Sequence, residues 1–345
     1  LRIESPFRVA RDRLGAERRT VFRKAFDRLG AGDRSAVAAF MEKESFWLPD
    51  FALLCGLSDR FGGVSFQDWP DRDLVRRRPG ALRKAKAEWS EEVLFHGFLQ
   101  WVADTQWQEC LVAIHREGID LIGDLPIYVA PDGADVWAHP EWFQLGADRR
   151  PRRVAGVPPD AFAENGQFWG NPLYRWRAMA LGGHRFWKRR MARTLALFDR
   201  VRLDHFRGFA DYWSIPAGAP DARSGRWVRG PGMGALRPLL RLSGPDRILA
   251  EDLGDIDDRV RRLLARSGLP GMRVLQFAFD GDPDNPYLPY HIPRNSVAYT
   301  GTHDNDTLLG WLYEASPESR RQALDCCGHD GGDWGQGGFG APAVR

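Results

Sequence analysis

The pattern of apolar and polar positions divides the chain into a helical first third and a later part in which short strands alternate with helices. Apolar residues recur at helical spacing between residues 16 and 29, and Asp33 can cap a second helix that runs to Ser45. Ser90 begins an amphipathic run to about residue 103, and a separate helix is expected up to His115. We therefore expect a helical N-terminal excursion over about residues 1–118.

Short apolar runs after Gly118 predict buried strands, and several of them end on polar residues. The expected strands are Ile119–Ile122, Val201–Leu203, Ile248–Ala250, Met272–Phe279 and Ser296–Thr300. Helices are expected between them, from about His184 to Phe198 and from about Ile256 to Arg266. Alternating strands and helices favour an α/β fold with a parallel sheet, and polar residues at several strand ends favour a barrel over an open sheet.

We accordingly expect a (β/α)8 TIM barrel with insertions. Residues 130–200 are rich in Gly, Pro and Trp and are long for a barrel connection, so they are interpreted as a functional insertion. From Gly328 to Gly340, 7 of 13 residues are glycine with no apolar period, which predicts an irregular tail. The expected organisation is a partial catalytic barrel over 1–325 and a glycine-rich tail over 326–345.

Three acidic residues follow predicted strands, namely Asp204, Glu251 and Asp304. An isolated ionised carboxylate is costly to bury, so carboxylates at buried strand ends need partners there. Barrel enzymes build their active sites from side chains at the carboxyl ends of several strands. We therefore expect these three acids to meet in one pocket.

Such a group of acids suits the cleavage of glycosidic bonds, which in retaining enzymes uses two carboxyl groups about 5 Å apart. Arg202 lies two residues before Asp204 on the same strand face, so Asp204 is expected to keep a low pKa and to be the permanent anion. Glu251 follows an apolar strand and lies beside Asp252, which would raise its pKa and let it carry a proton. Asp304 would bind sugar hydroxyls.

The chain has 14 tryptophans against 7 tyrosines, and many of them lie between residues 101 and 213. Tryptophans pack in cores, and they also form flat platforms against the apolar faces of sugar rings. For Trp137, Trp142 and Trp169 both interpretations stay open.

Composition limits the classes of partner that this protein is expected to bind. The net charge is +3, and no basic tract is interleaved with aromatic residues, so nucleic-acid binding is not expected. No apolar run approaches the roughly 18 residues that span a bilayer, so no membrane partner is expected. The four cysteines show neither a CxxC pair nor zinc spacing, which indicates reduced thiols and a cytoplasmic location without metal or cofactor. The sequence begins at Leu1 without a Met, which indicates a fragment.

Longer motifs carry a resemblance to a known family. In order along the chain these are Gly123–Val129, Asp135–Trp137, Gly156–Phe162, Gly166–Gln167, Trp169–Pro172, Arg202–Phe209, Ala250–Gly254 and Gly301–Asn305. With these motifs in this order, the chain resembles the 4-alpha-glucanotransferases of the amylomaltase (disproportionating enzyme) family, which are relatives of the alpha-amylases. Alpha-amylases usually carry an Asn-His pair where this chain has Tyr128–Val129, which favours the transferase branch.

The resemblance implies a retaining double displacement in which Asp204 is the nucleophile, Glu251 the acid/base and Asp304 the transition-state stabiliser. It also implies that Arg202 orients the nucleophile and that His303 contacts the sugar at the cleaved bond. Further substrate contacts are implied for Asp124, Tyr128, Pro158, Asp160, Phe162, Trp169 and Asn171. The implied donor is a maltodextrin or another alpha-1,4-glucan and the implied acceptor is glucose or an oligosaccharide, with no cofactor.

The chain also departs from the family pattern. An N-terminal strand with a Gly-Asp-Gly-type turn and a downstream Asn-x-Pro-Gly block are missing, so the barrel is expected to be incomplete at both ends. Some members carry Tyr at the position of Ala161. Pro158–Pro159 could instead be only a stiff turn, with Phe162 in the core.

Three other functions stay open. The first is an amylase-like hydrolase, and the second is a non-catalytic glucan-binding remnant. The third is a metal-dependent barrel hydrolase that would use His205, His303, Asp124 and Asp304, although the HxH pair that such barrels often carry on an early strand is missing.

Overall fold

The structure is a computed structural model that describes residues 11–160, 163–332 and 338–344. The chain divides into two units, each built from segments that are separate in sequence. The first unit contains Leu1–Asp120, Tyr128–Arg189 and Trp213–Val228, and the second contains Leu121–Ile127, Arg190–Tyr212 and Arg229–Arg345.

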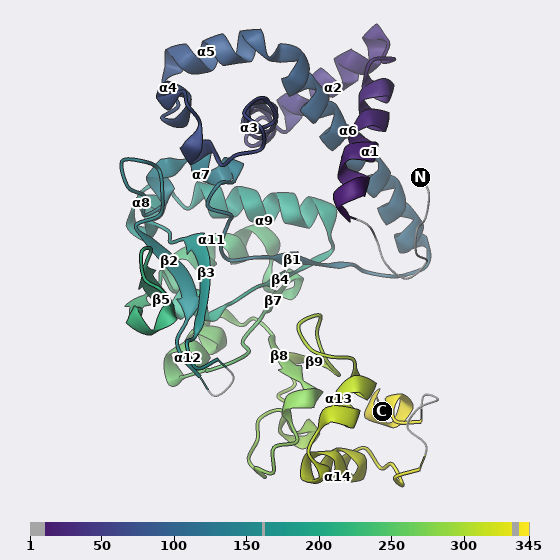
Figure 1. The fold of residues 1–345 in the computed structure, drawn as a ribbon. Helices are drawn as coiled ribbons and strands as arrows, with labels where there is room; N and C mark the ends of the chain where they lie inside the picture. The colour runs from purple at the N-terminus through teal and green to yellow at the C-terminus, as the bar shows by residue number, and fades with distance from the viewer. Residues whose placement is uncertain (1–10, 161–162, 333–337, 345) are drawn as a thin grey trace. The chain divides into compact units, whose positions relative to one another are not determined.

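Helices make up most of the first unit (Figure 1). They are α1 (Arg11–Phe26), α2 (Ala31–Lys43), α3 (Leu48–Arg60), α4 (Arg72–Val75), α5 (Pro79–Glu88), α6 (Ser90–Arg116), α7 (Ala134–Ala138) and α8 (Trp176–Leu181). The long helix α6 packs against α1, α2 and α3. Phe26, Val37, Phe95 and Phe98 form the apolar cluster between these helices, and the rings of Phe26 and Phe95 meet edge to face with centroids 5.4 Å apart. The expected N-terminal helical region is therefore confirmed.

Two details of that region differ from expectation. The break expected near residue 103 is absent, because the sequence from there to Leu111 contains no Gly or Pro and α6 continues to Arg116. The Thr105 hydroxyl donates a hydrogen bond to the Trp101 carbonyl, one turn earlier in the same helix, at 2.9 Å. Asp33 does not cap α2, because the helix begins two residues earlier and Asp33 lies in its first turn.

The first unit also contains antiparallel pairing, in a sheet of order β3-β2-β5-β6. These strands are β2 (Arg153–Val157), β3 (Gln167–Pro172), β5 (Asp211–Pro216) and β6 (Arg226–Arg229). At Gly156 a Cβ atom would lie 2.1 Å from the Gln167 carbonyl oxygen, so only glycine permits the close approach of β2 and β3. Much of the expected insertion over 130–200 is therefore regular structure.

Parallel strands make up the framework of the second unit. They are β1 (Ile122–Leu125), β4 (Arg200–Leu203), β7 (Ile248–Ala250), β8 (Gly271–Val274) and β9 (Ser296–Tyr299). The order is β1-β4-β7 in one sheet and β8-β9 in another, and the Ala250 N–H donates to the Pro270 carbonyl at 2.9 Å between them. The α/β class is therefore confirmed, with five parallel strands of the expected barrel among the described residues.

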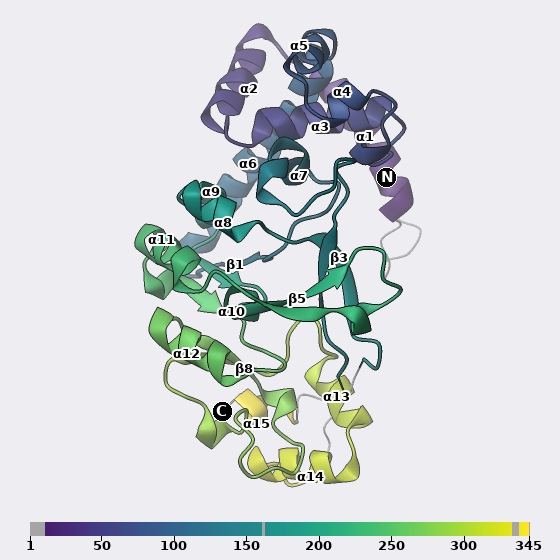
Figure 2. The ribbon, with the colours of Figure 1, turned by 90° about the vertical axis from the view of Figure 1, so that its left-hand side faces the viewer.

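Helices precede, connect and follow these strands. They are α9 (Arg185–Leu197), α10 (Arg207–Ala210), α11 (Met233–Ser243), α12 (Asp258–Ser267), α13 (Leu308–Glu314), α14 (Pro317–Cys326) and α15 (Gly340–Val344). Short 3-10 turns span Phe66–Asp68, Pro140–Trp142, Ala222–Ser224, Pro245–Arg247, Leu275–Phe277 and Pro289–His291. Helices α11 and α12 contact each other and lie side by side in Figure 2.

Two strands are shifted or shortened relative to the expectation. β1 begins at Ile122 rather than Ile119. The residues that face the interior are Gly123 and Leu125, whereas Ile119 and Ile122, which suggested an earlier buried strand, are exposed. β8 ends at Val274, and the chain then enters a 3-10 turn at Leu275, so the apolar run to Phe279 is not a continuous strand. In both places an apolar run misled the prediction about where the strand lies.

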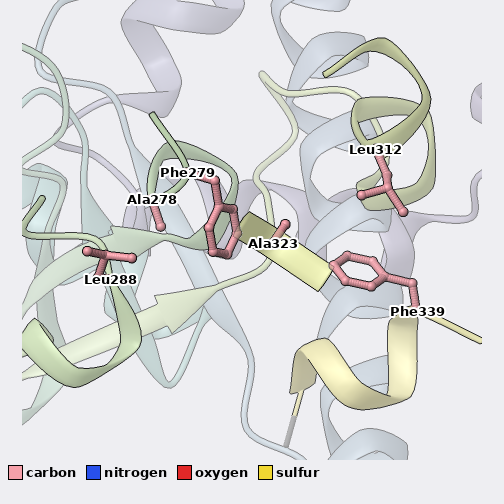
Figure 3. Close-up of a cluster of buried hydrophobic side chains, with 6 residues drawn as sticks. All are labelled: Ala278, Phe279, Leu288, Leu312, Ala323 and Phe339. Carbon is pink, nitrogen blue, oxygen red and sulfur yellow. The ribbon is translucent and has the colours of Figure 1, made fainter. Parts of the chain in front are cut away.

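The glycine-rich tail contributes to a core. Phe339 is 1% exposed and belongs to a cluster with Ala278, Phe279, Leu288, Leu312 and Ala323, which Figure 3 shows. The tail is therefore less irregular than the glycine content predicts, because a single aromatic side chain suffices to anchor it. Residues 333–337 lie outside the described part of the chain. The expected boundary between barrel and tail stays a prediction.

No helix within residues 11–160, 163–332 and 338–344 combines the length and apolar character needed to cross a membrane.

Trp137 is a core residue, which contradicts its interpretation as a sugar platform. Its side chain is 1% exposed, and its indole N–H donates to the Leu74 carbonyl at 3.0 Å. The ring meets Trp69 edge to face with centroids 5.8 Å apart, and the Arg77 guanidinium lies 4.3 Å from its centre. Protein atoms therefore cover nearly all of the Trp137 side chain.

We expect Trp137→Ala to lower the free energy of unfolding by about 3–5 kcal/mol, because it leaves a large cavity and an unpaired carbonyl. Trp169→Ala is the matched control, because Trp169 is 37% exposed, and we expect it to cost less than about 1 kcal/mol. Urea unfolding followed by circular dichroism measures both. Equal midpoints for the two variants would contradict the assignment of Trp137 to the core.

Candidate functional site

The register of the parallel strands in the second unit brings the expected site residues together. Leu203 of β4 pairs with Ala250 of β7, so Asp204 and Glu251 follow equivalent positions on neighbouring strands. Neighbouring strands lie roughly 4.8 Å apart, which is close to the separation that a retaining pair of carboxyl groups needs. The Glu251 N–H donates to the Leu203 carbonyl at 3.1 Å and extends the ladder by one residue.

Arg202 joins two carboxylates from neighbouring strands. Asp124 of β1 lies opposite Arg202 in the register and accepts from its Nε at 2.8 Å and its Nη2 at 3.3 Å. The same Nη2 donates to Asp204 Oδ1 at 2.7 Å. Alternation along β4 buries Val201 and Leu203 on one face and leaves Arg202 and Asp204 on the other. The fork of the guanidinium therefore orients both carboxylates.

Asp204 Oδ2, the second oxygen of this carboxylate, receives no hydrogen bond from the part of the chain that the structure describes. The side chain is 32% exposed, so this oxygen is available to an incoming group. Burial raises the pKa of Asp204, and although Arg202 opposes that rise, Asp124 and Asp304 add to it. The expectation that Arg202 holds this pKa below its usual range is therefore wrong, because desolvation is larger than the attraction.

Glu251 is held by two backbone donors. Its Oε2 accepts from the His205 N–H at 2.7 Å and its Oε1 accepts from the Leu253 N–H at 2.9 Å. His205 has φ +48°, a left-handed conformation that is uncommon outside glycine, and its N–H contacts Glu251 from there. The two donors fix the carboxyl group from both strand ends.

Burial raises the pKa of Glu251 to about 7, and the Asp204 carboxylate adds to the rise, while the Leu253 and His205 N–H groups and Arg202 oppose it. The expected direction is confirmed. Asp252, which was expected to contribute, has another partner, because its carboxylate accepts from Met272 N–H at 2.6 Å and pairs with Arg273 at 3.0 Å. A carboxyl group with this pKa exchanges its proton near neutral pH, as general acid/base work requires.

Asp304 and His303 belong to a turn that follows β9. Asn305 Oδ1 accepts from the Thr302 N–H at 3.0 Å and from its hydroxyl at 2.9 Å, which closes the turn. The side chains of His303 and Asp304 are 68% and 73% exposed, with Nε2 and Oδ2 3.4 Å apart. Both act electrostatically on Asp204, so the structure brings Asp304 into the neighbourhood of the other two acids.

The side chains named for a metal do not form a metal site. Burial lowers the pKa of His205 to about 4, and the positive charge of Arg207 lowers it further. Among the described residues, no group of three or more His, Cys, Asp or Glu side chains has an arrangement that would hold a metal ion.

Some of the expected sugar contacts lie in the first unit. Trp169 lies on β3, and its ring centre is 6.3 Å from that of Tyr128, which in turn stacks on Tyr174 at 5.9 Å. Trp169 is 37% exposed and Tyr128 is 8% exposed. Asn171 donates from Nδ2 to the Val129 carbonyl at 2.9 Å. Trp169 is therefore an accessible aromatic surface, whereas the Asn171 amide fastens β3 to the segment after Ile127.

The loop after β2 contains the remaining expected contacts. Asp160 is exposed, and its Oδ1 accepts from the Ala163 N–H at 2.7 Å, while Pro158 is partly exposed. Phe162 and Ala161 lie outside the described residues. Trp142 is partly covered, because its ring stacks on His139 with centres 4.0 Å apart.

Sequence reasoning missed the residues that act through the backbone. The N–H groups of His205 and Leu253 hold Glu251, and no side-chain pattern indicates this. Arg207 was noted only as part of a motif, yet its side chain is 7% exposed and paired with acids. The one signal that could have singled out Arg207 is its position as a charged residue shortly after a strand that ends on an acid.

Comparisons with known proteins identify the family. Residues 2–339 match the sequence profile of a family described as 4-alpha-glucanotransferase. The chain is 51% identical over 290 residues to a 4-alpha-glucanotransferase of Thermus thermophilus, covering 84% of this chain and 58% of that protein. It is 39% identical over 324 residues to the Clostridium butyricum enzyme of the same name, covering 92% and 66%.

A solved structure is similar as well. The amylomaltase from Streptococcus agalactiae in complex with acarbose superposes with a TM-score of 0.94 at 33% identity. The match covers 99% of this chain and 69% of that one. The chain thus spans about three fifths of the length of the curated relatives that it matches.

Glu251→Gln tests the electrostatics of the site through stability. Since the folded pKa is about 7 against 4.5 for a free glutamate, the folded state binds more protons between these values. Ionisation of Glu251 therefore costs stability as pH rises from about 4.5 to 7, by up to roughly 3 kcal/mol. A neutral glutamine avoids that cost.

We expect the stability of Glu251→Gln relative to the parent to rise between pH 4.5 and pH 8. Urea unfolding at both pH values measures this difference. Asp258→Asn is the matched control, because the Asp258 side chain is 77% exposed. A relative stability of Glu251→Gln that does not change with pH would mean that its pKa is unperturbed.

Proposed function

Because this chain belongs to the 4-alpha-glucanotransferase family, we propose that the protein moves alpha-1,4-glucan segments between maltodextrins by a retaining double displacement. The observation that carries the proposal is the pair of carboxyl groups on neighbouring strand ends in different surroundings. Asp204 has one oxygen on Arg202 and a side chain that is 32% exposed, whereas Glu251 is more buried and has a pKa of about 7. This difference in surroundings supports a nucleophile role for Asp204 and an acid/base role for Glu251.

In the first step, Asp204 Oδ2 attacks the anomeric carbon of the sugar on the donor side of the cleaved bond. The bond from that carbon to the glycosidic oxygen breaks, and its electron pair stays on the departing oxygen. Glu251 donates its proton to this oxygen, so the leaving chain departs as a neutral alcohol. The product is a glucosyl ester of Asp204 and an ionised Glu251.

In the second step, Glu251 acts as the base. A sugar 4-hydroxyl attacks the same anomeric carbon, Glu251 takes its proton, and the ester bond to Asp204 breaks with its electrons returning to the carboxylate. The configuration is retained because each step inverts it once. The ionised Glu251 formed in the first step is the base that the second step needs.

We assign supporting roles to the charged neighbours. Arg202 holds Asp204 Oδ1, which leaves a lone pair of Oδ2 directed toward the anomeric carbon that it attacks. Asp124 fixes Arg202 from the neighbouring strand. Asp304 would stabilise the positive charge that develops on the sugar, and His303 would contact that sugar beside it.

We propose a maltodextrin or another alpha-1,4-glucan as the donor, and glucose or an oligosaccharide as the acceptor. The amylomaltase that this chain resembles is in complex with acarbose. Trp169 offers an accessible ring face for a sugar. Tyr128, Pro158, Asp160, Phe162 and Asn171 remain candidates for further contacts. A cytoplasmic location stays a prediction.

Incubation of the protein with maltotriose tests the activity. We expect glucose together with maltodextrins longer than maltotriose, because a sugar hydroxyl resolves the Asp204 ester in place of water. Chromatography of the products over time measures this. Maltose and glucose without longer chains would indicate the amylase-like hydrolase, and binding without turnover would indicate the glucan-binding remnant. Addition of a chelator should leave the rate unchanged. Loss of activity on chelation would indicate the metal-dependent hydrolase.

Asp204→Asn tests the nucleophile. The amide cannot form the ester, so we expect transfer to fall by at least about 10³-fold. Intact mass spectrometry after acid quenching of a reaction with alpha-maltosyl fluoride should detect a maltosyl adduct on the parent and none on the variant. Asp258→Asn, which changes a carboxylate that is 77% exposed, is a control for the mass measurement. An adduct on Asp204→Asn would rule out this assignment.

A further inference from the structure

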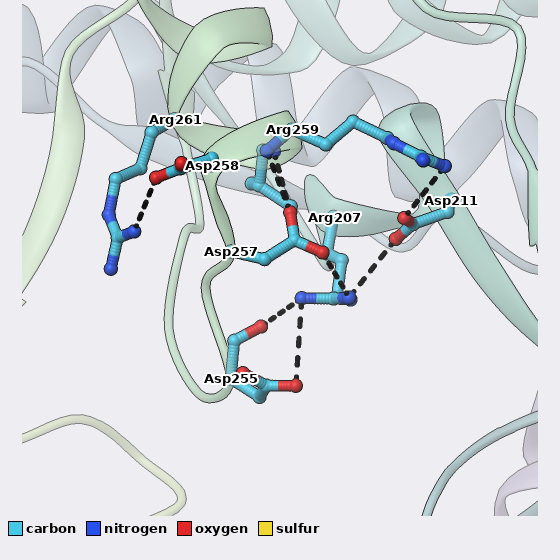
Figure 4. A network of polar contacts seen from close by, with 8 residues as sticks. Arg207, Asp211, Asp255, Asp257, Asp258, Arg259 and Arg261 are labelled. Carbon is cyan, nitrogen blue, oxygen red and sulfur yellow. Dashed lines mark hydrogen bonds and ion pairs between the residues drawn. The ribbon is translucent and has the colours of Figure 1, made fainter.

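Arg207 is a buried cation that no step of the proposed reaction uses. It is the first residue of α10, three residues after Asp204, and its side chain is only 7% exposed. Figure 4 shows its guanidinium beside Asp211 and beside Asp255 and Asp257, which follow Glu251 in the chain. Nη1 donates to the Asp255 backbone carbonyl, and Nη2 donates to Asp257 Oδ2 at 3.1 Å.

The partners of Arg207 are themselves held in place. Asp257 caps α12, because its Oδ1 accepts from the N–H groups of Arg259 at 2.9 Å and Val260 at 3.1 Å. Asp211, 5% exposed, lies 3.2 Å from Arg207 Nη2 and accepts from Arg259 Nη1 at 3.4 Å. Arg207 therefore links the end of β4 to the first turn of α12. Its contacts are with Asp255 and Asp257 in the segment after β7 and with Asp211 at the start of β5.

Burying a guanidinium with carboxylates adds little to stability on balance, because desolvation offsets much of the attraction. Two apolar side chains of similar volume would hold α10 against α12 as well. What an apolar pair cannot do is fix the direction of a loop backbone through a hydrogen bond to a carbonyl. The bond to the Asp255 carbonyl does this for the segment between Glu251 and Asp257.

That segment carries one of the two donors on Glu251. The Leu253 N–H contacts Oε1, and it lies two residues before the carbonyl that Arg207 holds. At the other end, the Phe206 N–H donates to the Glu251 carbonyl at 3.0 Å, directly beside Arg207 in sequence. Arg207 thus closes a ring of contacts that runs from the end of β4 through Glu251 and back.

We propose that Arg207 is a positioning residue that holds the Glu251–Asp257 segment against the end of β4 and so fixes the proton-carrying carboxyl group. This inference rests on the proposed function of Glu251 as acid/base. It assigns Arg207 no contact with the sugar. Its effect passes through the Asp255 carbonyl and the Leu253 N–H to Glu251.

The leaving group of the donor separates this role from a purely structural one. Maltotriose needs the proton of Glu251 to release its sugar, whereas alpha-maltosyl fluoride releases fluoride without such help. With azide as the acceptor, the second step needs no base either. Loss of a well-positioned Glu251 should therefore slow transfer from maltotriose and spare fluoride release in azide.

We expect Arg207→Met to lower kcat/KM for maltotriose by about 10- to 100-fold, the scale of a misplaced catalytic group. Fluoride release in azide should change by less than about threefold. Arg207→Lys should recover part of the maltotriose activity, because the ammonium replaces the charge but not the two-pronged contact. Asp257→Asn, which can still cap α12, removes one ion pair of Arg207 and keeps both the buried arginine and its contact with Asp211.

The pH dependence of kcat/KM for maltotriose is a second test of the positioning role. Glu251 faces Asp204 and Arg202 from the end of β4 and Tyr287 from the segment before Pro289, and these groups are unchanged in the variants. Water entering a loosened segment lowers the pKa of Glu251, whereas a displaced Leu253 N–H raises it. Since burial is the largest cause of the raised pKa, we expect a net fall. The alkaline limb of kcat/KM for maltotriose, which needs protonated Glu251, should then move to lower pH in Arg207→Met and in Asp257→Asn.

Arg261→Met is the matched control, because Arg261 also pairs with an acid on α12 but is 64% exposed. It should keep the parent ratio of maltotriose to fluoride rates and the parent alkaline limb. Equal losses on both donors in Arg207→Met, or a limb that stays in place in both variants, would overturn the positioning role. A parent protein without transfer activity would instead reject the proposed function itself, which keeps the two failures distinct.

Discussion

A single guanidinium between two carboxylates is the interaction on which the candidate site depends. Arg202 pairs with Asp124 across the β1–β4 register and with Asp204 along its own strand, and its side chain is only 13% exposed. Without this cation, Asp124, Asp204 and Glu251 would bring three acids together in partly buried surroundings, where like charges repel strongly. The strand order that places Arg202 between these acids therefore makes the cluster tolerable and gives Asp204 a defined orientation.

The same surroundings divide the work between two chemically similar side chains. Glu251 is more deeply buried and receives two backbone N–H groups, yet desolvation still raises its pKa to about 7. Asp204 also has a raised pKa, but Arg202 opposes the rise and contacts only one of its two oxygens. In the proposed reaction, environment rather than residue type thus distinguishes the proton carrier from the anion.

Several features could be predicted from local patterns. The strands that end before Asp204, Glu251 and the Thr302–Asn305 turn were found because apolar runs followed by polar residues are local signals. Elsewhere a local pattern was insufficient. The residues around Trp137 do not indicate its burial, because Trp69 and Arg77, which cover it, belong to segments that are distant in sequence. The single helix α6, by contrast, could have been predicted locally, because the sequence from residue 103 to Arg116 contains no Gly or Pro.

The amino-acid sequence alone determined that the chain is α/β, which strand ends carry acids, and that its motifs resemble one family, because these follow from residue order and short-range periodicity. Only the tertiary structure decided the protonation behaviour of those acids and the residues that hold them. Desolvation depends on every neighbouring atom, so the rise in the pKa of Asp204 could not be read from the nearby Arg202. Nor could the N–H groups of His205 and Leu253, whose directions are set by backbone conformation and not by side-chain type.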